Sequence, residues 1–547
     1  MLSKINSAGI SGVDGFMVSV EVDESNGLPR SVIVGNVSPS VREAMERCDV
    51  ALRNVGIDLP PKRVTVNLAP AGRRKDGTTY DLAILTGMLR ALRLVSDIPL
   101  EQYGFLGEIG LDGTVRHING VLPLIAEMRA AGLNGAVVPY SCVQEALVIE
   151  GMDIIGVRDI SDLVTLLRSH DHFKTFPRES PALQKNESSY SVDFSELHGQ
   201  AFGIRAALIA AAGRHNILLS GTAGSGKTMI ARRIPTILPP LSKKENIEIT
   251  KVYSVAGLLP EGASLINQRP FRTPHHTITT AALIGGSAQG GVIPGELALA
   301  ANGVLFLDEL PLFSKSSIEA LRQPMEDKKV VLNRLQGKFT YPADCLIVAA
   351  MNPCPCGFYP DRNKCSCTPG QIRSYQRGIS KPILERIDLC VEVAPVSFEE
   401  LKSTTETCSS KDLQNAVLEA RAIQQHRFRN SSVQCNADMG IREIHSYCAL
   451  GPEEEHFMER IFTLKSMSMR TYHKVLKVAR TIADLDRSSD ISVSHLAEAI
   501  GYRGLEDKLF DFSPSAGQTS SSMPIHSTSK NPPAKHLIHS KAGKESL

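Results

Sequence analysis

Residues 216–228 read Asn-Ile-Leu-Leu-Ser-Gly-Thr-Ala-Gly-Ser-Gly-Lys-Thr, a short apolar run followed at once by the pattern GxxxxGK[ST]. The pattern lies between a predicted strand and a predicted helix, which is the context that such a loop requires. Its glycines let the backbone curl so that amides point at phosphate oxygens, and the helix N-terminus adds the positive end of its dipole. The stretch therefore predicts a phosphate-binding loop in an α/β fold. A Gly-rich turn with a stray lysine is the competing interpretation.

The chain around this loop has 547 residues, which is enough for three or four domains. Lys and Arg number 60 against 58 Asp and Glu, so binding to a polyanion would have to come from a local patch. The absence of Trp argues against an aromatic stacking surface. The sequence has neither an apolar run of about 18–20 residues nor a signal peptide, and its 11 Cys are scattered. We expect a reduced, cytoplasmic protein with no membrane partner.

Changes in residue pattern along the chain predict its domain organisation. Strand-like segments (Phe16–Val22, Arg63–Leu68) and helix-like ones (Val41–Val55, Asp81–Leu94) mix in the first part, and strands alternate with helices after the phosphate loop, which is typical of a parallel sheet. The predicted segments are a mixed α/β domain (1–168), a polar linker (169–192), an α/β domain with a parallel sheet (193–395), a helical domain (396–505) and a disordered, mildly basic tail (506–547).

Each part of the phosphate loop has an expected task. The backbone of the loop would hold the phosphates, Lys227 would neutralise the β- and γ-phosphates of a nucleotide, and the Thr228 hydroxyl would bind Mg²⁺. The residues of this predicted ATP and Mg²⁺ site are Gly221, Thr222, Ala223, Gly224, Ser225, Gly226, Lys227 and Thr228.

Polar residues follow two further apolar strands. The strand Val304–Leu307 ends in Asp308 and Glu309, which would hold Mg²⁺ and polarise the attacking water. The strand 345–350 leads to Asn352, which is placed to orient water or the γ-phosphate. Two arginines have two interpretations each. Arg386, on a predicted helix, and Arg470, at the start of the predicted helix 470–485, are either surface charges or stabilisers of the transition state.

These residues, in this order, resemble the AAA+ ATPases, and within them the magnesium-chelatase-like YifB/ComM family. The resemblance runs from near residue 1 to about residue 503. The stretches that carry it are GTAGSGKT, PFRTPHHTITTAALIGG, PGELALAANGVLFLDEL, AAMNPCPCGFYPD and MRTYHKVLKVARTIADLD. It implies that Lys227 and Thr228 belong to Walker A and that Asp308 and Glu309 form Walker B. Asn352 would be sensor 1, Arg386 an arginine finger acting in trans, and Arg470 sensor 2. Ser380-Lys-Pro, where the family usually has Ser-Gly-Pro, is a small departure.

The first 168 residues resemble the proteolytic domain of Lon-type proteases, a ribosomal-S5-like α/β fold. The Lon pattern places a Ser nucleophile after a Lys-Asp-Gly-Pro stretch and a Lys after Gly-Gly-Leu. Here Thr79 stands at the first position and Leu122 at the second. A hydroxyl without its amine base has no route to activation. We therefore expect a degenerate domain without protease activity.

Four cysteines gather in one Gly/Pro-rich loop. Cys354 and Cys356 precede Cys365 and Cys367 by eight residues, and four thiols in a short segment match a tetrahedral Zn²⁺ site. The CxC spacing, rather than CxxC, leaves structural free thiols as the alternative. The adjacent pair His275-His276 suggests a metal site, but neighbouring side chains on a strand point apart, so a structural hydrogen-bonding role is expected instead.

Three functions compete for this architecture: a DNA translocase, a chelatase-type motor that remodels a protein partner, and the disfavoured protease. Residues 330–341 predict a β-hairpin, in which Arg334 and Lys338 would contact phosphates or would be ordinary surface charges. The resemblance implies a homo-hexameric ring that acts on single-stranded or branched DNA, in branch migration during transformation, with recombination proteins as further partners.

Overall fold

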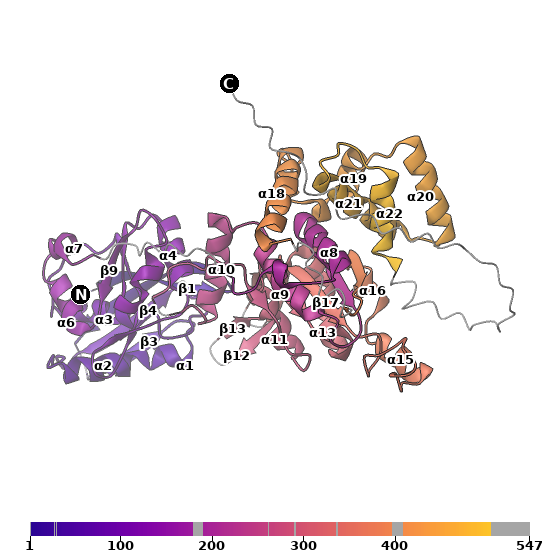
Figure 1. The fold of residues 1–547 in the computed structure, drawn as a ribbon. Helices are drawn as coiled ribbons and strands as arrows, with labels where there is room; N and C mark the ends of the chain where they lie inside the picture. The colour runs from indigo at the N-terminus through magenta and orange to yellow at the C-terminus, as the bar shows by residue number, and fades with distance from the viewer. Residues whose placement is uncertain are drawn as a thin grey trace, which may run out of the picture. The chain divides into compact units, whose positions relative to one another are not determined.

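The structure is a computed structural model of the 547-residue chain (Figure 1). It describes residues 2–26, 28, 30–178, 190–260, 262–288, 291–334, 337–396 and 408–504. Part of the predicted linker and the predicted tail lie outside these residues. The chain divides into two compact units, each built from separated stretches of sequence: Met1–Ser191 with Pro240–Val348, and Val192–Pro239 with Ala349–Leu547. The consecutive domain boundaries given above remain a prediction.

The first unit contains a seven-stranded sheet in the order β3-β4-β2-β1-β5-β8-β9. β2 pairs antiparallel with β1 and with β4, whereas β3–β4, β1–β5, β5–β8 and β8–β9 are parallel pairs. The predicted strands at residues 16–22 and 63–68 are confirmed, each as part of a longer strand. The strand bounds are β1 Leu2–Ser11, β2 Asp14–Ser25, β3 Arg30–Val34, β4 Arg63–Ala69, β5 Tyr103–Phe105, β8 Gly135–Pro139 and β9 Asp153–Val157.

Helices cover both faces of this sheet (Figure 1). Ile5 and Ala8 of β1 lie three positions apart and therefore point to opposite faces. Ile5 belongs to one buried core, with the helices around residues 44–54, 81–91 and 160–167, and Ala8 belongs to a second core with the helices around residues 121–130 and 143–146. The two predicted helices are confirmed. The bounds are α1 Pro39–Arg42, α2 Ala44–Asn54, α3 Asp81–Ala91, α4 Val121–Ala130, α5 Val143–Ala146, α6 Ile160–Leu167 and α7 His172–Thr175.

The rest of the first unit contains the parallel pair β11–β14 and two antiparallel hairpins, β12–β13 and β15–β16. The second hairpin confirms the one predicted at residues 330–341, and residues 335 and 336, between its two strands, lie outside the described residues. The bounds are α10 Lys243–Val255, β11 Phe271–Arg272, α11 Thr280–Ile284, β12 Gly285–Ala288, β13 Gly291–Pro294, α12 Glu296–Leu299, β14 Val304–Leu307, α13 Lys315–Ala320, α14 Arg322–Asp327, β15 Lys329–Arg334 and β16 Gly337–Pro342.

The second unit begins with a helix, a strand and a helix, and continues into a helical region. β10 (Ile217–Ser220) pairs in parallel with β18 (Leu389–Glu392), and both are apolar and largely buried. Within 408–504, the described part of the predicted helical domain, the elements are helical. The helix bounds are α8 Ala201–Gly213, α9 Lys227–Ile237, α15 Pro369–Gln376, α16 Lys381–Leu384, α18 Ser410–Arg427, α19 Ile441–Tyr447, α20 Pro452–Leu464, α21 Met469–Leu485 and α22 Val493–Gly501.

Five strands form the predicted parallel sheet, in the order β11-β14-β17-β10-β18. β17 (Leu346–Met351) is buried at all six positions, as expected of a strand that is covered on both faces. Since the order in space differs from the order in sequence, the chain must cross over between strands, which is the topology of a doubly wound α/β sheet. The predicted fold class is confirmed.

Buried ion pairs hold the helical region to the strand that ends at residue 392. The Lys474 ammonium on α21 lies 2.6 Å from the Asp388 carboxylate, which also accepts the Asn216 backbone N–H. Burial raises the pKa of Asp388, but Lys474 and His215 together outweigh it and hold this pKa well below the ordinary range. No helix among the described residues is long and apolar enough to cross a membrane.

Candidate functional site

The predicted phosphate loop connects β10 to α9, and its backbone conformation explains why glycine occupies several of its positions. Gly224 and Gly226 have φ angles of +78° and +90°, in the left-handed region that favours glycine. A Cβ atom on Gly221 would lie 2.3 Å from the Val393 carbonyl oxygen, so this position accepts no side chain. The loop is therefore a compact turn of backbone that ends at the N-terminus of α9, where helix amides favour anions.

Lys227 and Asn352, predicted to share one site, are in contact. The Lys227 side chain is only 8% exposed, and its ammonium lies 2.7 Å from the Gly221 carbonyl and 2.8 Å from the Thr222 carbonyl. It also donates to the Asn352 Oδ1 atom at 3.1 Å. Asn352 directly follows β17, so the strand end brings the amide to the lysine. A group bound at Lys227 would therefore also be within reach of Asn352.

Gln200 is a positioning residue that the sequence analysis missed. It precedes α8 and is 6% exposed. Its Nε2 atom donates to the Ser225 carbonyl at 2.9 Å and to the Ala394 carbonyl at 3.1 Å, so one amide holds the loop and the segment after β18. A single glutamine outside the motif gives no signal in the sequence.

Thr228 is the second residue of α9 and is half-buried. Its place in the first helical turn, next to Lys227, is where a hydroxyl can join the coordination of a cation bound to phosphates. The structure thus gives the loop, Lys227, Thr228 and Asn352 an arrangement that suits a nucleotide with Mg²⁺.

The predicted acidic pair follows a fully buried strand. Asp308 and Glu309 come directly after β14, and the Glu309 backbone N–H donates to the Asp308 Oδ1 atom at 3.0 Å. Glu309 has a φ angle of +52°, a conformation that non-glycine residues rarely adopt. Such backbone strain is concentrated at functional sites, where it aims a side chain. The unusual backbone at Glu309 thus helps to set the direction of its carboxylate at the end of the strand.

The predicted arrangement of His275 and His276 is wrong. β11 ends at Arg272, because Pro274 cannot donate a ladder hydrogen bond, and the two histidines lie in the turn that follows. Their rings do not point apart: the ring centroids are 4.1 Å from each other. The His276 Nδ1 atom lies 3.7 Å from a carboxylate oxygen of Glu309, the candidate general base.

His275 has the expected structural role, since its Nδ1 atom lies 2.9 Å from the Thr277 hydroxyl. His276 is therefore the second residue that the sequence analysis missed. The contact with Glu309 depends on the direction of the His276 side chain. The turn sets this direction, and the sequence does not show it.

The two candidate arginines occupy different surroundings. Arg386 follows the short helix α16 (residues 381–384) rather than lying within it, and its Nη1 atom donates to the Pro382 carbonyl at 2.8 Å. It is half-buried, next to the buried Ile387. Arg470 is the second residue of α21 and is exposed. Their roles as finger and sensor remain predictions.

Arg334 and Lys338 are both exposed near the end of the β15–β16 hairpin. The register pairs Asn333 with Lys338 and Arg334 with Gly337. Because cross-strand partners share a face, the two basic side chains lie on opposite faces of the hairpin. The other end of the hairpin is anchored by Tyr341, which is fully buried and donates to the Val292 carbonyl at 2.8 Å.

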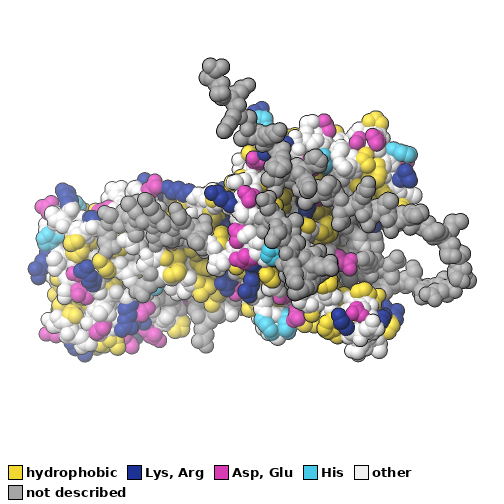
Figure 2. Space-filling model, in the orientation of Figure 1, with side chains coloured by type: hydrophobic (Ala, Val, Ile, Leu, Met, Phe, Trp, Pro, Cys, Tyr) yellow, Lys and Arg dark blue, Asp and Glu magenta, His cyan; other side chains and the backbone are white. Residues whose placement is uncertain are grey.

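This hairpin is a local basic feature on a surface of mixed charge. On the face drawn in Figure 2, Lys and Arg side chains are interspersed with Asp and Glu, as the net charge of +2 suggests. A general attraction of the chain to polyanions is therefore not expected.

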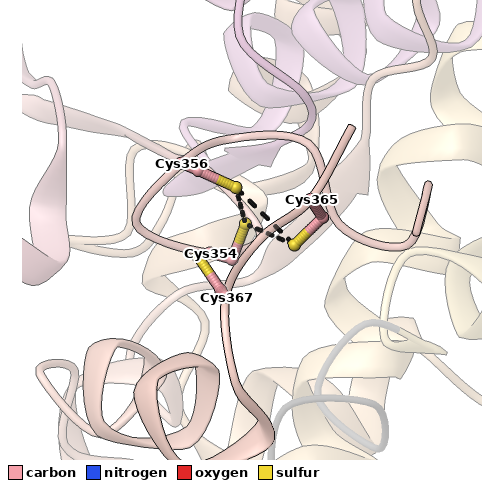
Figure 3. A group of neighbouring side chains, drawn as sticks. All are labelled: Cys354, Cys356, Cys365 and Cys367. Carbon is pink, nitrogen blue, oxygen red and sulfur yellow. Dashed lines mark hydrogen bonds between the residues drawn. The ribbon is translucent and has the colours of Figure 1, made fainter. Parts of the chain in front are cut away.

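The structure brings the four predicted cysteines together (Figure 3). The Sγ atoms of Cys354, Cys356, Cys365 and Cys367 all lie within 4.8 Å of one another. Cys354 and Cys365 are buried and pack with Ile372 of α15, and the other two are half-buried. A hydrogen bond from the Phe358 backbone lowers the pKa of Cys356 to about 6, which favours a thiolate at neutral pH. Four converging thiols suit a soft metal ion.

In the Lon-like region, the two positions that differ from the protease pattern serve the fold. Leu122 is fully buried in the first turn of α4, and its backbone N–H donates to the buried Glu145 carboxylate at 2.7 Å. The Thr79 carbonyl accepts the Gly107 backbone N–H at 3.0 Å. The side chain at 122 is thus an apolar core residue in place of an amine.

Fold and site together define a P-loop ATPase of the AAA+ class. Residues 193–401 match the family described as "Magnesium chelatase, subunit ChlI", residues 20–141 match "Subunit ChlI of Mg-chelatase", and residues 407–503 match "Magnesium chelatase, subunit ChlI C-terminal". The chain belongs to the ComM/YifB family of magnesium-chelatase-like ATPases.

Two of the relatives are similar along almost their entire length, and a third is similar over a short part of it. Competence protein ComM of Haemophilus influenzae is 36% identical over 92% of this chain and 98% of its own. The uncharacterized protein YifB of Salmonella typhimurium is 36% identical over 92% of this chain and 97% of its own. Lon protease 2 of Bacillus subtilis is 27% identical over 25% of this chain and 26% of its own. The predicted family resemblance, including a partial likeness to Lon proteases, is confirmed.

Proposed function

We propose that the protein is a homo-hexameric AAA+ motor that uses ATP hydrolysis to move on single-stranded or branched DNA, in branch migration during transformation or recombination. The observation that carries the proposal is the likeness, over nearly the whole of both chains, to a protein named for competence. The contact between Lys227 and Asn352 supports the ATPase part, because it joins the phosphate loop to the residue expected to sense the γ-phosphate.

In this proposal each site residue has one task in ATP hydrolysis. The loop amides and Lys227 bind the phosphates, while Thr228 and Asp308 hold Mg²⁺. Glu309 takes a proton from the attacking water, and Asn352 orients that water or the γ-phosphate. Arg386 of a neighbouring subunit and Arg470 stabilise the charge that develops on the transferred phosphoryl group. Zn²⁺ bound by Cys354, Cys356, Cys365 and Cys367 is a structural cofactor.

The DNA contact is assigned to the tip of the β15–β16 hairpin. A ring of six subunits would place about twelve charges from Arg334 and Lys338 around one strand. Since the two side chains lie on opposite faces of the hairpin, a strand that passes over the tip could meet both. Binding of this kind tracks phosphates and therefore tolerates any base sequence.

A salt titration tests this assignment. Arg334→Ala with Lys338→Ala should weaken DNA binding and reduce the slope of log affinity against log salt, because fewer counterions are released. The ATPase rate without DNA should not change. Lys315→Ala with Lys411→Ala, a double variant at exposed lysines elsewhere in the chain, is the matched control. An unchanged affinity and salt slope in the hairpin variant would mean that another part of the protein contacts the DNA.

A chelatase-type motor that remodels a protein partner is the second candidate, because all three matched family descriptions name magnesium chelatase. The steady-state ATPase rate of the full chain, measured with and without single-stranded and branched DNA, separates the two. A DNA motor should hydrolyse ATP several-fold faster with DNA. A rate that DNA leaves unchanged, in a protein that hydrolyses ATP, would favour the chelatase-type motor.

A further inference from the structure

The cysteine loop is joined to the phosphate loop by main-chain hydrogen bonds. The Ala223 backbone N–H, at the tip of the phosphate loop, donates to the Gly357 carbonyl at 3.2 Å. The Gly221 backbone N–H donates to the Met351 carbonyl at 3.3 Å. Gly357 directly follows Cys356, and Met351 lies three residues before Cys354. The segment that carries the first two cysteines therefore also supports the backbone that would hold phosphate.

The sulfur atoms of Cys354, Cys356 and Cys365 have close to the spacing of a tetrahedral metal site, and that of Cys367 lies within 4.8 Å of them. Four ligands at a Zn–S distance of about 2.3 Å stand about 3.8 Å from one another. The Sγ–Sγ distances are 3.3 Å for Cys354–Cys356, 3.6 Å for Cys356–Cys365 and 3.8 Å for Cys354–Cys365. A disulfide would require about 2.05 Å, and all of these cysteines are free thiols. The four side chains point toward a common centre (Figure 3).

The turn that presents the Gly357 carbonyl is held by the same cysteines. The Gly357 backbone N–H donates to the Cys354 carbonyl at 3.0 Å, and the Tyr359 N–H donates to the Cys354 Sγ atom at 3.4 Å. Gly357 itself has a φ angle of +82°. A metal ion that fixes Cys354 and Cys356 would fix this turn, and with it the acceptor for Ala223.

Asn352 is attached to the same segment. It lies two residues before Cys354 and contacts the Lys227 ammonium at 3.1 Å. The carbonyl of Pro353, between them, accepts the Gln376 amide of α15 at 3.1 Å. The cysteine loop therefore supports both the tip of the phosphate loop and the side chain that contacts its lysine.

We propose that a zinc ion held by Cys354, Cys356, Cys365 and Cys367 sets the affinity of the phosphate loop for ATP through the hydrogen bond between Ala223 and Gly357. The proposal rests on the zinc site and the ATPase function proposed above. The coupling is reciprocal: if zinc raises the affinity for ATP by some factor, ATP raises the affinity for zinc by the same factor. Zinc then regulates nucleotide binding and also holds the cysteine loop in place.

The first experiment compares the full chain with and without zinc. Metal content is measured on the purified protein, and the dissociation constant of a fluorescent, non-hydrolysable ATP analogue is measured with excess Mg²⁺ before and after a zinc-selective chelator. The expected result is one zinc per chain and about tenfold weaker analogue binding after zinc removal, with unchanged far-UV circular dichroism and recovery when zinc is added back. Equal affinity with and without zinc would overturn the proposal.

The two proposals on which this one rests fail in different ways. A protein that is purified without zinc and takes up none when zinc is added, but binds the analogue, would rule out the metal site and leave the ATPase function standing. A zinc-loaded, folded protein that binds no analogue would contradict the ATPase function itself.

A glycine substitution tests the coupling while all four thiols stay in place. A Cβ on Gly357 would lie 3.1 Å from the Ala223 Cβ, at a φ angle that strains any side chain. Gly357→Ala should keep one zinc per chain but bind the analogue about tenfold more weakly. Gly370→Ala is the matched control, since its Cβ would meet only the Thr368 Oγ1 atom, at 3.9 Å.

Because the coupling is reciprocal, it can also be measured as the effect of the ATP analogue on zinc affinity. In the parent and in Gly370→Ala, the analogue should raise zinc affinity, measured by competition with a chromogenic chelator, about tenfold. In Gly357→Ala this factor should fall toward one. A zinc-loaded Gly357→Ala protein with parental analogue affinity and parental coupling would contradict the proposal. The two loops would then be in contact, but the hydrogen bond between them would not link zinc binding to ATP binding.

Discussion

Two buried lysines, one in each unit, show what distinguishes a phosphate site from a structural anchor. Lys227 is 8% exposed and Lys75 is fully buried. The Lys227 ammonium donates to oxygen atoms of Gly221, Thr222, Ser225 and Asn352, at the N-terminus of a helix. The Lys75 ammonium donates to the Pro70 carbonyl, and burial lowers its pKa. Burial alone therefore does not define the site; the surrounding polar groups do.

The backbone around Lys75 explains its role. Its N–H donates to the Asn36 carbonyl at 2.9 Å, and its carbonyl accepts the Ser38 N–H at 2.9 Å. The residue thus ties the segment after β3 to the turn before α3. The Lys-Asp-Gly stretch resembles that of Lon proteases in sequence. Here it holds two segments of the sheet domain together.

The largest expected effect is the loss of ATP hydrolysis in Lys227→Ala. Removing the ammonium takes away the charge that faces the phosphates, and the loss of one such electrostatic contact costs about 10²–10³ in turnover. Steady-state phosphate release measures it. Lys75→Met, which keeps the length and removes the charge, should retain the parental rate. Loss of turnover in a folded Lys75→Met protein would break the distinction between the two lysines.

The next effect separates binding from chemistry in the nucleotide site. Glu309→Gln should bind ATP normally and lose turnover by about 10², because an amide cannot accept the proton of the attacking water. Equilibrium binding of a fluorescent ATP analogue and phosphate release are measured on the same preparation. Near-parental turnover would show that Glu309 is not the general base.

A smaller effect is expected at the histidine pair. His276→Ala should lower kcat about tenfold without changing ATP affinity, since the ring contacts Glu309 rather than the loop. His275→Ala is the control, because that ring contacts Thr277. If both variants lose the same activity, the turn matters as a whole and His276 has no particular role toward Glu309.

The smallest effect is a dependence of stability on pH at Lys75. Its pKa is lowered in the folded protein, so between that pKa and 10.5 the unfolded chain binds the proton and the folded chain does not. The free energy of unfolding should therefore rise with pH in this window, relative to Lys75→Met. Urea unfolding of both proteins between pH 7 and pH 10 measures the difference. A constant difference would mean that the pKa of Lys75 is the same in both states.

The sequence predicted the elements whose signal is local. The strand at residues 304–307, the loop at 221–228 and the hairpin at 330–341 follow from apolar runs and turn residues, and the structure has each of them. The gathering of the four cysteines followed from their spacing in a short loop. Such features depend on neighbours in sequence, so a single chain is enough to predict them.

The missed contacts depend on how separate segments turn toward one another. Gln200 reaches the phosphate loop across 25 positions of sequence, and His276 reaches Glu309 only because Pro274 ends the strand before it. The hydrogen bond between Ala223 and Gly357 joins two backbone groups, which leave no trace in residue type. Side-chain direction and main-chain pairing over such separations are set by tertiary packing.

Branch migration on a synthetic DNA junction is the most direct test of whether this ATPase moves DNA strands. The full chain is mixed with a labelled three- or four-stranded junction and MgATP, and strand exchange is followed over time. We expect exchange by the parent and by Lys75→Met, and none by Lys227→Ala or Glu309→Gln. A parent protein that hydrolyses ATP and binds the junction but never moves its strands would contradict the proposal that this ATPase is a DNA motor.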